Sequence, residues 1–278
     1  MIIDFHTHTF PKKIAEKAIK KLSSQSHIRA YTDGTPEDLE RSAVNAGVDL
    51  AVVQPVATNP DKVPNINDVS IENTGRGRLM YFGCMHPDYP GYRDELKRIA
   101  QAGIKGIKLH PVSQNRALDD IKYLRILEEC GKLGLIALIH AGIDLGKPGV
   151  NLSTPDMAVR AAEQVGPVKM VMAHMGGHLC WQDVPKMAQY ENIYIDTSTS
   201  LGKIEPIDDH YGNDELMMLT ESRFMDIVRA FSADRVLFAT DSPWGDQKRE
   251  IDNIKKLPLT NDELEKILGG NAVRLLKI

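Results

Sequence analysis

Short apolar runs alternate along the chain with longer segments in which apolar and charged residues recur at helical spacing. Eight of the apolar runs have the length and the β-branched content of buried strands. They cover residues 2–5, 50–54, 79–85, 106–110, 135–139, 168–173, 193–197 and 235–239. The pattern therefore predicts eight strands spread over the whole chain.

Helical segments fall between these strands, and several carry start and stop signals. Pro11 stands in a first turn, Thr35 and Thr154 precede Pro and acidic residues as N-caps do, and Gly134 follows a helix end. The predicted helices cover residues 11–22, 35–46, 92–102, 119–133, 154–165 and 260–269. Eight strand-helix units predict a (β/α)8 TIM barrel in one domain, residues 1–278, with a doubly wound open sheet as the alternative.

Side chains that can bind a metal stand where predicted strands end. His6 and His8 are two residues apart on an extended segment, so their imidazoles point to the same side. His140, His174 and Asp241 directly follow three other apolar runs. Since the C-terminal ends of barrel strands gather at one mouth, we expect the five donors to meet there. Nitrogen and oxygen donors suit zinc or a similar divalent ion better than calcium.

The alternation of side chains along a strand assigns faces to the other residues of the first run. It places Asp4 on the face of His6 and His8, and Ile3 and Phe5 on the opposite face.

In the fourth run, the same alternation predicts that Lys108 and His110 both look into the barrel mouth. A lysine there could pair with a substrate carboxylate, shift its pKa, or become carbamylated and bridge two metals. Its ammonium could equally reach solvent at the mouth.

Three further residues are candidates for chemistry or binding. We expect His174 to be the acid/base catalyst, because the Gly176-Gly177 pair after it lets backbone approach a ligand closely. His178 either contacts the substrate, or begins a helix, or hydrogen-bonds to residues that hold the site without contacting the substrate itself. Trp244, three residues beyond Asp241, either forms an apolar wall for a planar substrate or packs the last loop.

Composition narrows the function classes. The chain of 278 residues has a net charge of -4 and only short lysine pairs, so we expect no nucleic-acid partner. No charged leader precedes the first strand and no run is long enough to span a membrane, which leads us to expect a cytoplasmic protein without a membrane partner. The 3 cysteines are expected to be free thiols.

Five segments together resemble a known family. They are Asp4-Phe5-His6-Thr7-His8, Gly106-Ile107-Lys108-Leu109-His110-Pro111, the strand before His140, Ala173-His174-Met175-Gly176-Gly177 and Thr240-Asp241-Ser242-Pro243-Trp244. In this order they are similar to the amidohydrolase superfamily, and to its amidohydrolase-related (amidohydrolase 2) branch, which includes aminocarboxymuconate semialdehyde decarboxylase.

The resemblance implies roles that spacing alone does not assign. It implies one metal held by His6, His8, His140 and Asp241, with His174 activating water and Asp241 sharing in proton transfer. Binuclear members of the superfamily also use a carbamylated fourth-strand lysine, so Lys108 leaves a second metal open. The family further implies that a homodimer would be unsurprising.

We therefore expect first a metal-dependent hydrolase acting on a small, carboxylated amide, ester or lactone. The alternative is a nonoxidative decarboxylase on the same scaffold. A phosphoesterase or deoxyribonuclease would predict a glutamate after the fourth strand and a basic surface, whereas this chain has Lys108 and net acidity. A noncatalytic metal-binding protein is the weakest reading, because structural zinc sites are closed and usually rich in cysteine.

Overall fold

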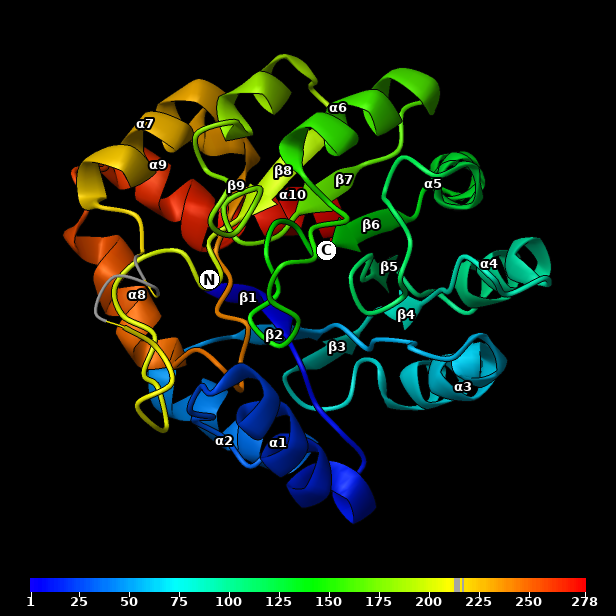
Figure 1. Ribbon diagram of the computed structural model, residues 1–278, viewed down its shortest axis with the longest axis horizontal. Helices are drawn as coiled ribbons and strands as arrows, with labels where there is room; N and C mark the ends of the chain where they lie inside the picture. Colours follow the sequence, from blue (N-terminus) through cyan, green and yellow to red (C-terminus); the bar gives the residue numbers. More distant parts are fainter. Residues whose placement is uncertain (213–215, 217) are drawn as a thin grey trace.

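A computed structural model of the chain describes residues 1–212, 216 and 218–278. Its strands lie side by side and parallel, with helices placed around them (Figure 1). The strands are β1 (Ile3–Thr7), β2 (Leu50–Val53), β3 (Leu79–Tyr81), β4 (Gly83–Cys84), β5 (Gly106–Leu109), β6 (Ile136–Ile139), β7 (Met170–Met172), β8 (Ile193–Asp196) and β9 (Val236–Leu237). Every predicted strand is present, and the third is divided into β3 and β4 around Phe82.

The helices confirm the predicted starts and add segments that the sequence pattern missed. They are α1 (Lys12–Ser26), α2 (Pro36–Ala46), α3 (Val63–Asn73), α4 (Tyr92–Gln101), α5 (Ile121–Leu133), α6 (Pro155–Gln164), α7 (Glu221–Phe231), α8 (Gln247–Lys256), α9 (Asn261–Glu265) and α10 (Asn271–Leu276). Short turns of helix are η1 (Pro60–Lys62), η2 (Val184–Gln189), η3 (Ala233–Arg235) and η4 (Lys266–Gly270). The hydroxyls of Thr35, Thr154 and Thr260 accept from backbone N–H groups of the first turns of α2, α6 and α9.

The first and last strands meet, so the sheet closes into a barrel. The strand order is β1-β2-β3 and then β4 through β9, and β3 and β4 are consecutive parts of one extended segment. Phe5 N donates to Phe238 O at 2.9 Å, and Asp241 N donates to His6 O at 2.8 Å. These bonds join β1 to the segment after β9, which confirms the predicted (β/α)8 barrel.

Apolar side chains form two separate layers around the strands. Ile3, Phe5, Phe82, Leu138 and Val171 belong to a cluster inside the barrel, and Ala272 and Leu276 of α10 pack onto it. A larger cluster fills the space between the strands and the surrounding helices. Because the barrel interior is filled with side chains, reacting groups have room only at its ends.

The predicted faces of β1 are wrong, and a register shift explains the error. Ile3 and Phe5 pack inside the barrel, whereas Asp4 points the other way and accepts hydrogen bonds from Thr240 and from Gln247 of α8. The pairing of β1 with β2 shifts register between Asp4 and Thr7. Such a bulge inverts the alternation, so His6 follows Phe5 into the interior instead of sharing a face with Asp4.

Two expectations from composition can be compared with the fold. Cys84, Cys130 and Cys180 are free thiols, as predicted. Within the described residues, the helices are too short or too polar to cross a membrane.

Candidate metal centre

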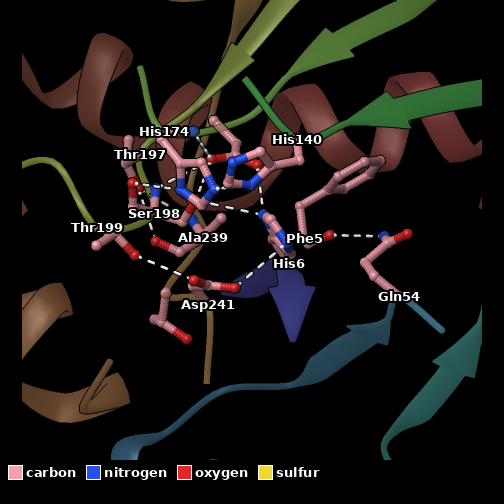
Figure 2. Close-up of polar contacts among 12 residues, drawn as sticks. Phe5, His6, Gln54, His140, His174, Thr197, Ser198, Thr199, Ala239 and Asp241 are labelled. Carbon is pink, nitrogen blue, oxygen red and sulfur yellow. Dashed lines mark hydrogen bonds and ion pairs between the residues drawn. The ribbon is translucent and has the colours of Figure 1, made fainter. Parts of the chain in front are cut away.

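The donors predicted at strand ends lie together at the barrel mouth (Figure 2). His6 Nε2 is 3.1 Å from His8 Nε2, and both approach the carboxylate of Asp241. Asp241 Oδ1 lies 3.4 Å from His6 Nε2 and 3.0 Å from His8 Nε2. The ring of His174 reaches His140, with Nε2 of His174 3.1 Å from Nδ1 of His140.

Strained backbone places two of these side chains. His174 and Asp241 both have φ of 60°, in the left-handed region that non-glycine residues rarely adopt. Each is held there by a backbone hydrogen bond, from His174 N to Asp196 Oδ1 at 2.9 Å and from Asp241 N to His6 O at 2.8 Å. Strain of this kind is typical of functional sites, because the surrounding fold must support it.

The proton on the imidazoles of His6 and His8 can be placed from the partner of each ring. His8 Nδ1 lies 2.7 Å from the carbonyl oxygen of Gln54, which can only accept, so Nδ1 carries the proton. His6 Nδ1 lies 2.9 Å from Asp196 Oδ2. Burial disfavours ionisation of Asp196, but its interactions with His6, His174 and Ser198 together outweigh this and lower the Asp196 pKa to about 2. Both Nε2 atoms are therefore left with lone pairs.

The same logic places the protons of His174 and His140. The hydroxyl of Ser198 donates to Asp196 Oδ1, so its oxygen can only accept from His174 Nδ1, 2.9 Å away. His174 Nε2 then holds a lone pair and accepts from His140 Nδ1. His140 Nε2 is left with a lone pair, is buried, and has no hydrogen-bond partner in the described part of the chain.

His6, His8 and Asp241 fit a divalent metal. The Nε2 lone pairs of His6 and His8 converge with Asp241 Oδ1, and their ligand atoms lie within 4.8 Å of one another. Lone pairs this close repel unless a cation shares them, and imidazole and carboxylate are ligands that suit zinc or a similar ion. His140 contacts His174, and its own ligand atoms group with those of His110 and Asp144.

Lys108 is an unexpected neighbour of the same nitrogen. Its side chain is 1% exposed, so the interpretation that its ammonium reaches solvent is wrong. Nζ donates to His6 Nε2 at 2.8 Å. Burial lowers the pKa of Lys108 to about 8, although Asp241 and Asp196 act in the opposite direction. The predicted interior face of β5 is thereby confirmed.

His110 lies at the mouth in a second group of possible metal ligands, with His140 and Asp144. Its ring stacks on His140 with centroids 4.1 Å apart. Ser113 N donates to His110 Nδ1 at 3.3 Å, so the neutral ring carries its proton on Nε2, 3.7 Å from Asp144 Oδ2. In this tautomer, Nε2 of His110 presents an N–H donor rather than a lone pair.

His178 lies near His174, and Trp244 is joined to Asp241 through the backbone. The buried ring of His178 lies 6.2 Å from that of His174, its Nδ1 faces the carbonyl of Thr199, and its Nε2 has no partner within the described residues. Burial lowers the pKa of His178 to about 4, so it is neutral. Trp244 is half-buried, and its backbone N–H donates to Asp241 O.

Sequence reasoning missed Asp196 and Ser198, which hold His6 and His174 in place. The sequence did carry a signal for Asp196, because this carboxylate stands at the end of an apolar run, β8, as the predicted donors stand at the ends of theirs. It was overlooked because an aspartate followed by Thr197 and Ser198 also reads as the start of a loop.

Comparison with known proteins decides the family. The family model described as amidohydrolase matches residues 3–278. The chain belongs to the amidohydrolase family. This amidohydrolase is thus an enzyme, and the superfamily resemblance of its five sequence segments is confirmed. No curated protein matches it by sequence.

Solved structures share its fold over nearly the whole length. The 5-carboxyvanillate decarboxylase of Sphingomonas paucimobilis is 16% identical, with a TM-score of 0.71, and the match covers 100% of this amidohydrolase and 99% of that chain. The 2,6-dihydroxybenzoate decarboxylase of Rhizobium is 18% identical, with a TM-score of 0.71 and coverage of 99% and 98%. A dihydroxybenzoic acid decarboxylase of Polaromonas sp. JS666, with bound manganese and 2-nitroresorcinol, is 15% identical, with a TM-score of 0.70 and coverage of 99% and 96%.

Proposed function

We propose that this amidohydrolase is a metal-dependent nonoxidative decarboxylase of a small hydroxylated aromatic acid. The observation that carries the proposal is its end-to-end similarity to several decarboxylases of such acids, at TM-scores of 0.70 to 0.71. The neutral His174 and the convergent lone pairs at the mouth supply groups that this reaction needs. The comparisons favour this alternative over the hydrolysis that the sequence placed first.

A divalent ion at His6, His8, His140 and Asp241 would polarise the oxygen atoms of the acid. Burial lowers the pKa of His174 to about 3, so its ring is neutral, and its Nε2 lone pair, which accepts from His140 Nδ1 in this structure, would accept the proton of the substrate hydroxyl. His174 then returns that proton to the ring carbon that bears the carboxylate. The carbon-carbon bond breaks, its electron pair stays with the ring, and carbon dioxide leaves. The resulting phenolate regains a proton from solvent.

If Lys108 keeps its proton and moves away from His6 Nε2 when the ion binds, its ammonium suits the carboxylate of such a substrate. Its Nζ lies 2.8 Å from His6 Nε2, and a carboxylate is the natural partner of a buried ammonium. His110, with its proton on Nε2, adds a second donor at the mouth, and His178 adds an acceptor. Trp244 remains a candidate for an apolar wall.

We propose one divalent ion per chain, as either zinc or manganese. The donor set favours zinc, and the Polaromonas relative carries manganese. A second ion would need Lys108 to lose its ammonium and become carbamylated. Hydrolysis of an amide, ester or lactone is the second candidate, supported by the lone pair of His174 Nε2 that could accept a proton from water.

The test is a parallel assay on metal-free protein reloaded with zinc or with manganese. We expect carbon dioxide and the matching phenol from 2,6-dihydroxybenzoate or 5-carboxyvanillate, and no product from benzoate, which lacks the hydroxyl. Hydrolysis of lactones or amides without carbon dioxide release from any hydroxybenzoate would overturn the proposal in favour of the second candidate.

A further inference from the structure

We infer that Asp196 and Ser198 are positioning residues that fix the protons of His6 and His174 on Nδ1, so that both rings present Nε2 lone pairs to the mouth. The inference rests on the proposed metal site but not on the proposed reaction, because decarboxylation and hydrolysis both need these lone pairs. Neither residue was among the predicted site residues, and neither provides a ligand to the proposed ion.

Asp196 is the centre of this arrangement. It is fully buried and accepts four hydrogen bonds. Oδ2 accepts from His6 Nδ1 at 2.9 Å, while Oδ1 accepts from the backbone N–H of His174 and from the N–H and hydroxyl of Ser198. One oxygen therefore orders a proposed metal ligand, and the other orders the loop that carries the proposed acid/base.

Ser198 connects Asp196 to the ring of His174 and so fixes the position of the proton on that ring. Its single hydroxyl proton is committed to Asp196, so its oxygen requires a proton on His174 Nδ1 at 2.9 Å (Figure 2). The Ser198 carbonyl oxygen, 3.4 Å from the same nitrogen, is a second and weaker acceptor for the proton on His174 Nδ1. The chain of bonds runs from the carboxylate through the hydroxyl to His174, and from there to His140.

The two oxygens of Asp196 allow a selective test. In Asp196→Asn, the remaining carbonyl oxygen can keep the three bonds at Oδ1, while the new NH2 group faces His6 Nδ1 and can only donate. His6 must then carry its proton on Nε2, where it blocks a metal. In Ser198→Ala, the Asp196 bond to His6 survives and only a longer contact of the Ser198 hydroxyl with His6 Nδ1, at 3.3 Å, is lost, whereas the ring of His174 keeps only its weaker contact with the Ser198 carbonyl.

Ser200→Ala is a matched control. Ser200 is as buried as Ser198 and lies in the same loop, but its hydroxyl donates to the backbone carbonyl of Thr197. Losing it removes one buried hydrogen bond of similar length without touching a histidine.

The experiment has two readouts that need no substrate. Long-range proton-nitrogen NMR of metal-free, histidine-labelled protein shows which ring nitrogen carries the proton, and metal titration gives the Kd for zinc and manganese. We expect Asp196→Asn to move the His6 proton to Nε2 and weaken metal binding about 10–100-fold. We expect Ser198→Ala to give His174 mixed tautomers while the metal Kd stays within about threefold.

Unchanged tautomers and unchanged metal Kd in Asp196→Asn, or a Ser200→Ala variant that matches Ser198→Ala in the NMR signals of His174, would overturn the inference. Circular dichroism identifies a variant that fails to fold, and if Asp196→Asn does so, the comparison of Ser198→Ala with Ser200→Ala still decides. Wild-type protein that binds no metal but shows the stated tautomers would refute the proposed site and leave the tautomer assignment standing.

Discussion

Lys108 and a metal ion would compete for the same electron pair. The ammonium donates to His6 Nε2 at 2.8 Å, and this is the nitrogen that faces His8 and Asp241. A buried cation beside convergent lone pairs compensates their repulsion in the absence of metal. Binding of an ion at His6 therefore requires that Lys108 withdraw or lose its proton.

This competition predicts that Lys108→Met tightens metal binding. With a Lys108 pKa of about 8, removing its proton at pH 7 costs about tenfold in affinity, and the variant is freed of that cost. Lys105→Met, a substitution on the half-buried lysine that precedes β5, is the control and should leave the Kd unchanged. Isothermal titration with zinc measures both, and loss of bound metal in Lys108→Met would instead indicate a carbamylated bridging lysine.

The different roles proposed for His140, as a metal ligand, and for His174, as the acid/base, give a second prediction. We expect His140→Ala to lose metal, because it removes a buried Nε2 lone pair, and His174→Ala to keep metal and lose turnover by about 100-fold or more. Elemental mass spectrometry of the purified variants gives the metal content. If His174→Ala also emptied the site, His174 would be a ligand and not the acid/base.

At the scale of single residues, the sequence predicted which side chains meet at the site, but not which nitrogen of each imidazole carries the proton. His6, His8 and Asp241 could be assigned because each ends an apolar run, and strand ends of a barrel meet at one mouth. Which nitrogen holds the proton depends on Gln54 and Asp196, which are far away in the sequence. No pattern along the chain reports such pairs.

At the scale of elements, α8 shows how an outer helix is tied to the barrel. Gln247, its first residue, donates to Asp4 of β1, and Glu250 one turn later is almost fully buried. Burial raises the pKa of Glu250 to about 7, because the charged form loses more solvation than Arg249 and Asn253 restore.

The raised pKa of Glu250 predicts that the free energy of unfolding falls as pH rises. Below the unfolded-state pKa of 4.5, Glu250 is protonated in both the folded and the unfolded chain, so its burial costs nothing. Between pH 4.5 and about 7 only the unfolded chain releases the proton, and this favours unfolding. The full loss, of about 3 kcal/mol, is reached above pH 7. Glu250→Gln should thus raise the Tm at pH 8 and have a much smaller effect at pH 4.5, as measured by calorimetry.

Asp252→Asn changes an exposed carboxylate of the same helix and serves as the control. It should leave the Tm nearly unchanged at both pH values. A Glu250→Gln variant that is no more stable than wild type at pH 8 would mean that its contacts with Arg249 and Asn253 outweigh the cost of burial.

The elements that the sequence predicted well are those with strong local signals. The capped helices α2, α6 and α9 start where their threonines are, and the apolar runs gave the strands. The face of Asp4 was mispredicted because a bulge depends on pairing with β2, and α3, α7 and α8 were missed although their buried faces pack well. Thr220 caps α7 and Asp246 caps α8, so these two helices carry start signals that the prediction did not use, whereas α3 has no side-chain cap.

At the scale of the whole molecule, the proposed ion would link the first strand of the barrel to later strands, including the last. His6 belongs to β1, His140 follows β6 and Asp241 follows β9. An ion bound only by the folded state stabilises it by about 2.7 kcal/mol at a free concentration 100 times the Kd. Dialysis against a chelator should therefore lower the Tm by several degrees, and His140→Ala should show no such response.

The predicted homodimer and the absence of a nucleic-acid partner stay predictions. Light scattering after size-exclusion chromatography measures the first, and a mass near twice 30.9 kDa would support it.

The bonds that close the barrel also order events during synthesis. His6 and Asp241 are 235 positions apart (241 minus 6), so at about 5–20 residues per second roughly 10–50 s pass between their additions to the chain. Until then β1 has only β2 as a neighbour, and His6 and His8 lack the carboxylate that faces them. The nascent chain consequently lacks part of the proposed centre while its earlier parts fold, and we expect an ion to bind there only after the last strand is made.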